Sequence, residues 1–319
     1  MSATKYDIDV DLGAPDTSHR HMVEMVGSNK LVLDVGCATG YLAKTLKAFG
    51  NRVTGVEYDP EAAELARAHT ERVIQADLDH DDLSELLAGS TFDVIVFGDV
   101  LEHLRDPLPP LRQAKSLLAP GGYIVISIPN VGHGDVRMSL LLGRFPYRNL
   151  GLLDNTHLRF FTRATVREML DDAGFAAVEV RTTSAPLFGT ELGVQPDEVD
   201  PAVVAAISAD TDAHVYQFVL TAVPRDATAL AAEAAWQAQQ GAVELKLAQA
   251  QVGELTTSLA QVRGQLADAE LANLSMRAEL DDLATRVEAG ELAKRELDAL
   301  LATRTLRTRS ATLRMMRRA

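Results

Sequence analysis

The sequence is poor in cysteine and aromatic residues, and it lacks any long apolar run. Its single cysteine, Cys37, excludes an intramolecular disulfide framework and is typical of a reducing compartment. No uninterrupted apolar stretch approaches the roughly 20 residues that a membrane-spanning helix needs, and the charge-dotted N-terminal stretch has no secretory core. These absences predict a cytoplasmic protein.

Proline is absent after Pro224, where the composition changes to Ala, Leu, Gln and Glu. Residues 1–225 hold 32 acidic and 19 basic side chains, a net charge of −13, whereas residues 226–319 hold 13 and 12. The change predicts a globular domain at 1–225, a helical segment at 226–303 and a basic tail at 304–319.

In the globular part, short apolar runs alternate with amphipathic stretches. The runs predict strands at 31–35, 52–57, 73–75, 92–97 and 123–128, and the stretches between them predict helices at 41–49, 60–69, 81–87 and 107–118. A helix at 162–173 and strands at 176–182 and 214–223 follow, with a surface insertion at 184–212. This alternation predicts an α/β fold with a doubly wound sheet that binds ligands at the carboxyl ends of its strands.

The first predicted strand runs into a glycine-rich turn that holds Asp34, Gly36 and Gly40. This turn is not the G-x-G-x-x-G of dinucleotide sites, and its acid would repel a diphosphate. It suits a ligand with a positive end, such as the ammonium and sulfonium of S-adenosylmethionine. Glu57 ends the second strand, where a carboxylate can accept both ribose hydroxyls, and Asp77 follows the third, placed for an adenine amino group.

Together these motifs resemble the class I S-adenosylmethionine-dependent methyltransferases over about residues 15–225. The runs that carry the resemblance start at Leu31, Val56, Ala76, Phe92 and Leu118. The family implies a seven-stranded Rossmann-like sheet with an antiparallel last strand and S-adenosylmethionine as methyl donor. It also implies a set of donor-binding residues, namely Asp34, Gly36, Cys37, Gly40, Glu57, Tyr58, Asp77, Leu78 and Gly98.

An alcohol acceptor must lose its proton, either to a general base or through a metal-bound alkoxide. The fourth strand is followed by Asp99-Val-Leu-Glu102-His103, and a second histidine, His157, precedes a later helix. If a helical turn begins at Asp99, positions 99, 102 and 103 share one face. We predict His157 as a base or acceptor-orienting group, and His103 as either catalytic or part of the pocket floor.

The same residues resemble the metal-binding E-x-x-E-H pattern of small-RNA 2′-O-methyltransferases and of ubiquinone-pathway O-methyltransferases. Asp99 stands where that pattern has its first glutamate, which shortens the reach toward a cation. The sequence therefore leaves open a divalent metal held by Asp99, Glu102, His103 and His157.

Residues 130–160 are expected to cap the pocket and to set acceptor specificity. Their Arg137, Arg144, Phe145, Tyr147 and Arg148 fit a phosphorylated or glycosyl acceptor, although a solvated loop would look the same. The run resembles O-methyltransferases found beside glycosyltransferases in bacterial polysaccharide assembly, which implies a sugar or glycan hydroxyl as acceptor. The alternatives are a small-molecule (quinone or secondary metabolite) O- or N-methyltransferase and a non-catalytic coiled-coil scaffold.

The helical part has a heptad pattern that starts at Leu245 and continues to Leu301. Its apolar a and d positions include Val252, Leu255, Leu259, Val262, Leu266, Met276, Leu280, Leu283, Val287 and Leu297. A heptad sustained this long predicts a coiled coil, and Asn273 at an a position favours a parallel homodimer.

The last residues form a basic tail with six arginines after Thr303. The tail is either a solvated helix end or an attachment to an anionic membrane surface, the inner face of a bilayer included, or to an acidic partner in glycan assembly. Nucleic acid is a poor partner because the globular part, at −13, would be repelled by phosphate.

Overall fold

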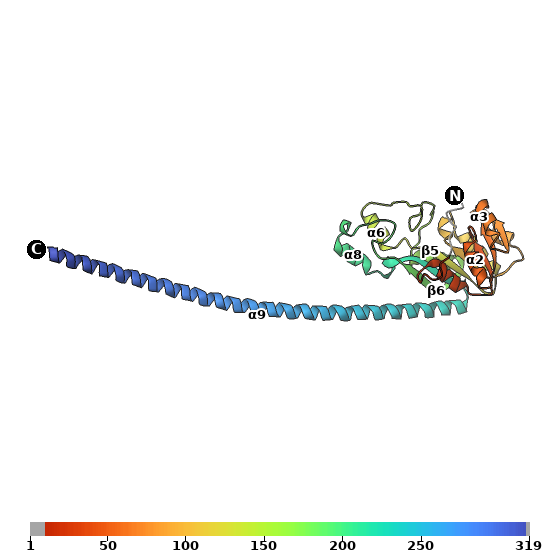
Figure 1. Cartoon of the computed structure of the whole chain (residues 1–319). Helices are drawn as coiled ribbons and strands as arrows, with labels where there is room; N and C mark the ends of the chain where they lie inside the picture. The colour runs from red at the N-terminus through yellow and green to blue at the C-terminus, as the bar shows by residue number, and fades with distance from the viewer. Residues whose placement is uncertain (1–9, 317–319) are drawn as a thin grey trace. The chain divides into compact units, whose positions relative to one another are not determined.

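The computed structural model describes residues 10–316 and separates them into two units. One compact unit ends at Gln239, and the other, from Gln240 onward, is helical. Figure 1 draws the first as a sheet flanked by helices and the second as part of one long helix. Among the described helices, none is long and apolar enough to span a bilayer.

The compact unit is built on a seven-stranded sheet in the order β3-β2-β1-β4-β5-β7-β6. The strands are β1 (Leu31–Val35), β2 (Arg52–Glu57), β3 (Arg72–Gln75), β4 (Phe92–Gly98), β5 (Leu118–Pro129), β6 (Phe175–Ser184) and β7 (Val215–Pro224). Strands β1 to β5 pair in parallel, while β7 lies antiparallel between β5 and β6. This arrangement confirms the predicted doubly wound sheet with an antiparallel last strand.

Helices cover both faces of the sheet. The helices of the described residues are α1 (Ser18–Val26), α2 (Tyr41–Ala48), α3 (Pro60–Ala66), α4 (Leu83–Leu86), α5 (Leu108–Leu117), α6 (Gly134–Leu141), α7 (Arg163–Ala173), α8 (Pro201–Ser208) and α9 (Ala227–Met316), of which α9 continues into the second unit. Strand β4 shows why both faces are covered: Val94 and Val96 pack on one side with α1 and α2, and Ile95 and Phe97 on the other with α4, α5 and α7. A strand buried on both faces needs the continuous apolar run that the sequence has there.

The structure adds elements that periodicity did not predict. Helix α1 begins after Thr17, whose side chain accepts a hydrogen bond from the Arg20 amide, and ends at Val26, before Gly27, so it spans only nine residues. Strand β5 starts at Leu118 rather than at residue 123, because Leu118 already pairs with Phe92 of β4, and the register shifts before Tyr123 pairs with Val94. Short elements carry too few repeats for a period to be recognised.

The predicted surface insertion is half of a small lobe with a core of its own. We call residues 130–160 together with 185–214 the insertion lobe. Its buried apolar side chains come from both segments, as with Val136 and Leu153 against Leu192. Figure 1 shows α6 and α8 of this lobe at the same end of the compact unit.

A buried carboxylate joins the two halves of the insertion lobe. Asp135, at the start of α6, accepts hydrogen bonds from the Phe188 amide (2.7 Å) and from the amide and hydroxyl of Thr190 (3.1 and 2.6 Å). Its side chain is fully buried. Asp135 therefore links the two segments of the lobe through hydrogen bonds to residues more than fifty positions away.

We expect Asp135→Asn to lower the free energy of unfolding by about 2 kcal/mol, since the charged acceptor of three hydrogen bonds is lost in a buried site. Urea unfolding followed by circular dichroism measures the change. The control is Asp197→Asn, at an exposed acid of the same lobe, with an expected change below about 0.5 kcal/mol. Equal stability of the two variants would contradict this role of Asp135.

Candidate functional site

A glycine-rich loop connects β1 to α2 and turns sharply at three positions. Gly36, Ala38 and Gly40 all have positive φ, at 75°, 47° and 81°. A side chain at Gly36 would begin 2.3 Å from a methyl group of Val100, so only glycine fits there. The loop thus passes close over the end of β4, and we call residues 36–40 the donor loop.

Two carboxylates lie against this loop. Glu57, at the end of β2, accepts hydrogen bonds from the Ala38 amide (2.8 Å) and the Asp59 amide (2.9 Å). Asp34 is buried, and one of its carboxylate oxygens accepts no hydrogen bond within the described residues. Burial, together with the charge of Glu57, raises the pKa of Asp34 to about 7. A buried carboxylate oxygen without a partner is costly unless a cationic group reaches it, and the ammonium of the predicted donor is such a group.

The side chains of three other predicted donor-binding residues, Asp77, Leu78 and Tyr58, lie in different environments. Asp77 accepts hydrogen bonds from the Asp79 amide (3.0 Å) and the His80 ring (2.9 Å), and Leu78 packs on the core. Tyr58 is exposed.

At two further predicted donor-binding positions, Cys37 and Gly98, no side chain is available to contact a ligand. The thiol of Cys37 packs among buried side chains of α3 and β3, so only its backbone can face a ligand. Gly98 ends β4 beside Met22.

The two predicted histidines lie together beyond the end of β4. Their rings meet edge to face with centroids 4.9 Å apart, although 54 positions separate His103 from His157 in the sequence. The Leu158 and Arg159 amides bond to the Glu102 carbonyl at 2.8 and 3.0 Å, which fixes the later loop on the turn that carries His103.

The Glu102 carboxylate lies beside the two histidine rings. Its side chain is 1% exposed, and neither carboxylate oxygen accepts a hydrogen bond within the described residues. Burial, and then the charge of Asp99, raises its pKa well above the usual range. Ligand atoms of Glu102, His103 and His157 lie within 4.8 Å of one another, a spacing that a single cation could bridge.

Asp99 does not join this group, and the prediction that it shares a face with Glu102 and His103 is wrong. The helical turn starts only at Leu101, while Asp99 itself has a φ of +57°. Its carboxylate turns toward β5 and β7 and accepts hydrogen bonds from Ser127 (3.0 Å) and Gln217. The four-residue metal set of the sequence analysis is therefore reduced to three.

The three arginines that suggested a phosphorylated or glycosyl acceptor bind partners within the insertion lobe. Arg137 pairs with Asp210 at 2.6 Å and Arg144 with Glu198 at 2.8 Å. Arg148 donates to the Leu192 carbonyl at 3.3 Å. Because these arginines already have partners in the protein, their presence does not indicate a phosphorylated or glycosyl acceptor.

Comparison with known proteins identifies the family of this chain. Residues 20–180, half of the chain, match the family model described as a methyltransferase domain. A ubiquinone biosynthesis O-methyltransferase of Psychrobacter arcticus is 31% identical over 176 residues, which cover 54% of this chain and 68% of that protein. Its namesake in Xanthomonas campestris is 37% identical over 102 residues, 31% of this chain and 43% of that protein.

Among solved structures, an S-adenosylmethionine-dependent methyltransferase of Archaeoglobus fulgidus is similar at a TM-score of 0.46 and 19% identity. That similarity covers 64% of this chain and 90% of the other. The chain belongs to the methyltransferase family. With its donor loop and sheet order it is a class I S-adenosylmethionine-dependent methyltransferase, as the motifs predicted.

Sequence reasoning missed residues that the fold brings to the same edge of the sheet. His19 comes from α1, and Gln217 from β7. Neither lies in a recognisable motif, so only the fold reveals their position.

We expect Glu57→Ala to weaken binding of S-adenosylhomocysteine by about 2 kcal/mol or more, near 30-fold, because the ribose loses a charged acceptor and the Ala38 amide loses its partner. Titration calorimetry measures this, with the exposed Glu61→Ala as the matched control in α3. An unchanged dissociation constant in Glu57→Ala would show that this carboxylate does not face the donor.

Proposed function

We propose that this chain transfers a methyl group from S-adenosylmethionine to a hydroxyl of a small molecule, with the acceptor beside His157. The observation that carries the proposal is the group of Glu102, His103 and His157, in which a buried carboxylate without a partner lies beside two imidazoles. Such a group can accept the proton that a hydroxyl acceptor loses.

The acceptor class rests on two further observations. The similar proteins of known role are named ubiquinone biosynthesis O-methyltransferases, which favours the small-molecule alternative over the glycan acceptor. The arginines that suggested a phosphorylated or glycosyl acceptor already have partners in the insertion lobe. A ring-bearing hydroxyl acceptor, as in a quinol, therefore replaces the sugar hydroxyl as our proposal.

The described residues fit the donor at three points. The unpartnered oxygen of Asp34 can take its ammonium, Glu57 its ribose hydroxyls, and Asp77 its adenine amino group. When bound, S-adenosylmethionine supplies an electrophilic methyl group on a sulfonium. The protein then contributes position, because an in-line displacement needs its nucleophile and leaving group aligned.

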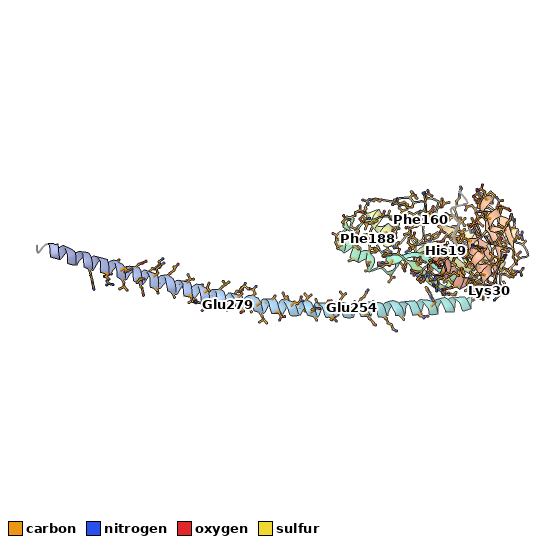
Figure 2. The ribbon with its side chains drawn as sticks, viewed as in Figure 1. His19, Lys30, Phe160, Phe188, Glu254 and Glu279 are labelled. Atoms are coloured by element: carbon orange, nitrogen blue, oxygen red, sulfur yellow. The ribbon has the colours of Figure 1, made fainter. Side chains whose placement is uncertain are left out.

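Proton removal falls to His157 in this proposal. The edge-to-face contacts of its ring with His103 and with Phe160 (6.1 Å between centroids) limit its rotation. His103 is held by the carbonyl and hydroxyl of Thr156, both 3.2 Å from Nδ1. Figure 2 marks Phe160 within the insertion lobe. The nearby Glu102 carboxyl can stabilise an imidazolium formed when His157 takes the proton.

A divalent cation is the alternative use of the same residues. Glu102, His103 and His157 would hold it, and two imidazoles with one carboxylate form a donor set that suits transition metals better than magnesium. Bound there, a cation would supply Lewis acidity to the acceptor oxygen.

We expect His157→Ala to lower turnover by roughly 100-fold or more while affinity for S-adenosylhomocysteine stays nearly unchanged. The assay uses radiolabelled S-adenosylmethionine with 3,4-dihydroxybenzoic acid as a soluble ring-hydroxyl probe. The exposed neighbour Asn155→Ala is the control, with turnover near that of the unmodified protein. Full activity in His157→Ala would remove this residue from the chemistry.

The same assay separates the base from the metal. Loss of activity in EDTA, with recovery in Mn²⁺ or Zn²⁺ but not in buffer alone, would replace the simple base by a cation at Glu102, His103 and His157. Activity that EDTA leaves unchanged supports His157 as a direct base.

We also propose that α9 pairs with its copy in a second chain. Its heptad side chains are open to solvent in the single chain, with Leu259 52% and Leu280 61% exposed. An isolated helix of this length cannot bury such a stripe, and Asn273 meets its own mate only in a parallel, in-register pair. In that register Arg286 also faces Glu291 of the second copy, an attractive pair across the seam.

We expect Leu280→Cys, at an a position, to form a disulfide-linked dimer under mild oxidation, because the two thiols would meet across the seam. Ala278→Cys, on the outer face of the same turn, should stay uncrosslinked. The only native cysteine, Cys37, is buried and gives no background. A monomeric mass for the full-length protein in light scattering would contradict the pairing.

Attachment of the basic tail to an anionic membrane surface, and cytoplasmic localisation, stay predictions. Helix α9 continues through Met316, so the backbone of the tail is helical that far, and Arg317 and Arg318 lie outside the described residues.

A further inference from the structure

A second ionisable pair lies at the carboxyl edge of the sheet, apart from the two-histidine group. It consists of Asp99, directly after β4, and His19 of α1, which Figure 2 labels within the compact unit. The mechanism above uses neither residue.

The Asp99 carboxylate is fixed through one of its oxygens. Oδ1 accepts hydrogen bonds from the Ser127 hydroxyl and the Gln217 amide, and that amide also bonds to Ser127 at 2.8 Å. No hydrogen bond from the described residues reaches Oδ2. A carboxylate held on one side and open on the other is arranged to meet a ligand.

His19 lies within electrostatic range of Asp99. Its ring meets the Tyr41 ring edge to face at 5.3 Å, and Tyr41 is the first residue of α2, directly after Gly40 of the donor loop. Burial lowers the pKa of His19, which favours a neutral imidazole, while the charge of Asp99 acts against that shift. Burial raises the pKa of Asp99, while the hydrogen bonds from Ser127 and Gln217 and the charges of His19 and His103 lower it. Besides burial, the charge of Asp99 in turn raises the pKa values of Glu102 and Tyr216.

The position of the pair relative to the donor follows from strand order. Strands β1 and β4 are neighbours, with Val35 opposite Phe97, so the donor loop and Asp99 leave adjacent strand ends. Gly36 passes directly over Val100, the residue after Asp99. The pair therefore flanks the end of the donor loop that holds the methionine portion of the donor.

We propose that Asp99, positioned by Ser127 and Gln217, recognises the positive charge of the donor sulfonium and so distinguishes S-adenosylmethionine from S-adenosylhomocysteine. The inference rests on the proposed donor site. A carboxylate of fixed orientation stabilises the charged sulfonium and gives little to the neutral thioether of the product, which favours exchange of product for fresh donor.

The test is titration calorimetry of the full-length protein with both ligands and no acceptor. We expect Asp99→Asn, which keeps the shape and removes the charge, to weaken S-adenosylmethionine at least tenfold and S-adenosylhomocysteine less than twofold. His19→Gln should shift the same ratio in the same direction by a smaller factor. Asp172→Asn, an exposed acid at the end of α7, is the control and should leave both affinities unchanged.

Equal losses for both ligands in Asp99→Asn, with His19→Gln unchanged, would give Asp99 a purely structural role and overturn the inference. Unchanged affinity for both ligands in both variants would equally overturn it. Failure of the unmodified protein to bind either ligand would refute the proposed donor site itself, a result that is distinct from a lost ratio.

Discussion

Burial of carboxylate oxygens without hydrogen-bond partners at one edge of the sheet is the constraint on which the site depends. Asp34 and Glu102 each have an oxygen that nothing in the described residues satisfies, and both have raised pKa values because of burial. Such groups cost stability, so the fold must offset them with the apolar layers on both faces of the sheet. A cationic ligand at Asp34 would remove part of that cost.

Segments that are distant in the sequence supply different residues of the site. The parallel strands bring Asp34, Glu57 and Asp99 to one edge, since parallel strand ends align there. The insertion lobe adds His157 through backbone hydrogen bonds to Glu102, and its own arginines and acids hold it together. In the proposed function, the core carries the donor-binding residues and the lobe carries His157 on the acceptor side.

Much of the sheet and the donor loop could be predicted from the sequence, because both are local signals. The apolar runs at β1, β2 and β4 and the turn at Gly36 and Gly40 each lie within a few neighbouring residues. The departures have a different physical origin. Asp99 does not lie on its predicted face, because its backbone adopts a left-handed conformation before the helical turn starts. The lobe arginines bind partners about 44 to 73 positions away in the sequence. Contacts at such separation leave no periodic trace in the sequence.

The central claim is that Asp34 receives the ammonium of the donor. The most direct test is titration of S-adenosylhomocysteine, which keeps that ammonium, at about pH 6 and about pH 8, on either side of the Asp34 pKa of about 7. Because the cation binds the ionised carboxylate, binding below the pKa must release the proton, and affinity should rise about tenfold between the two pH values. Asp34→Asn should bind weakly with no such rise. Affinity of the unmodified protein that is independent of pH over this range would contradict the account.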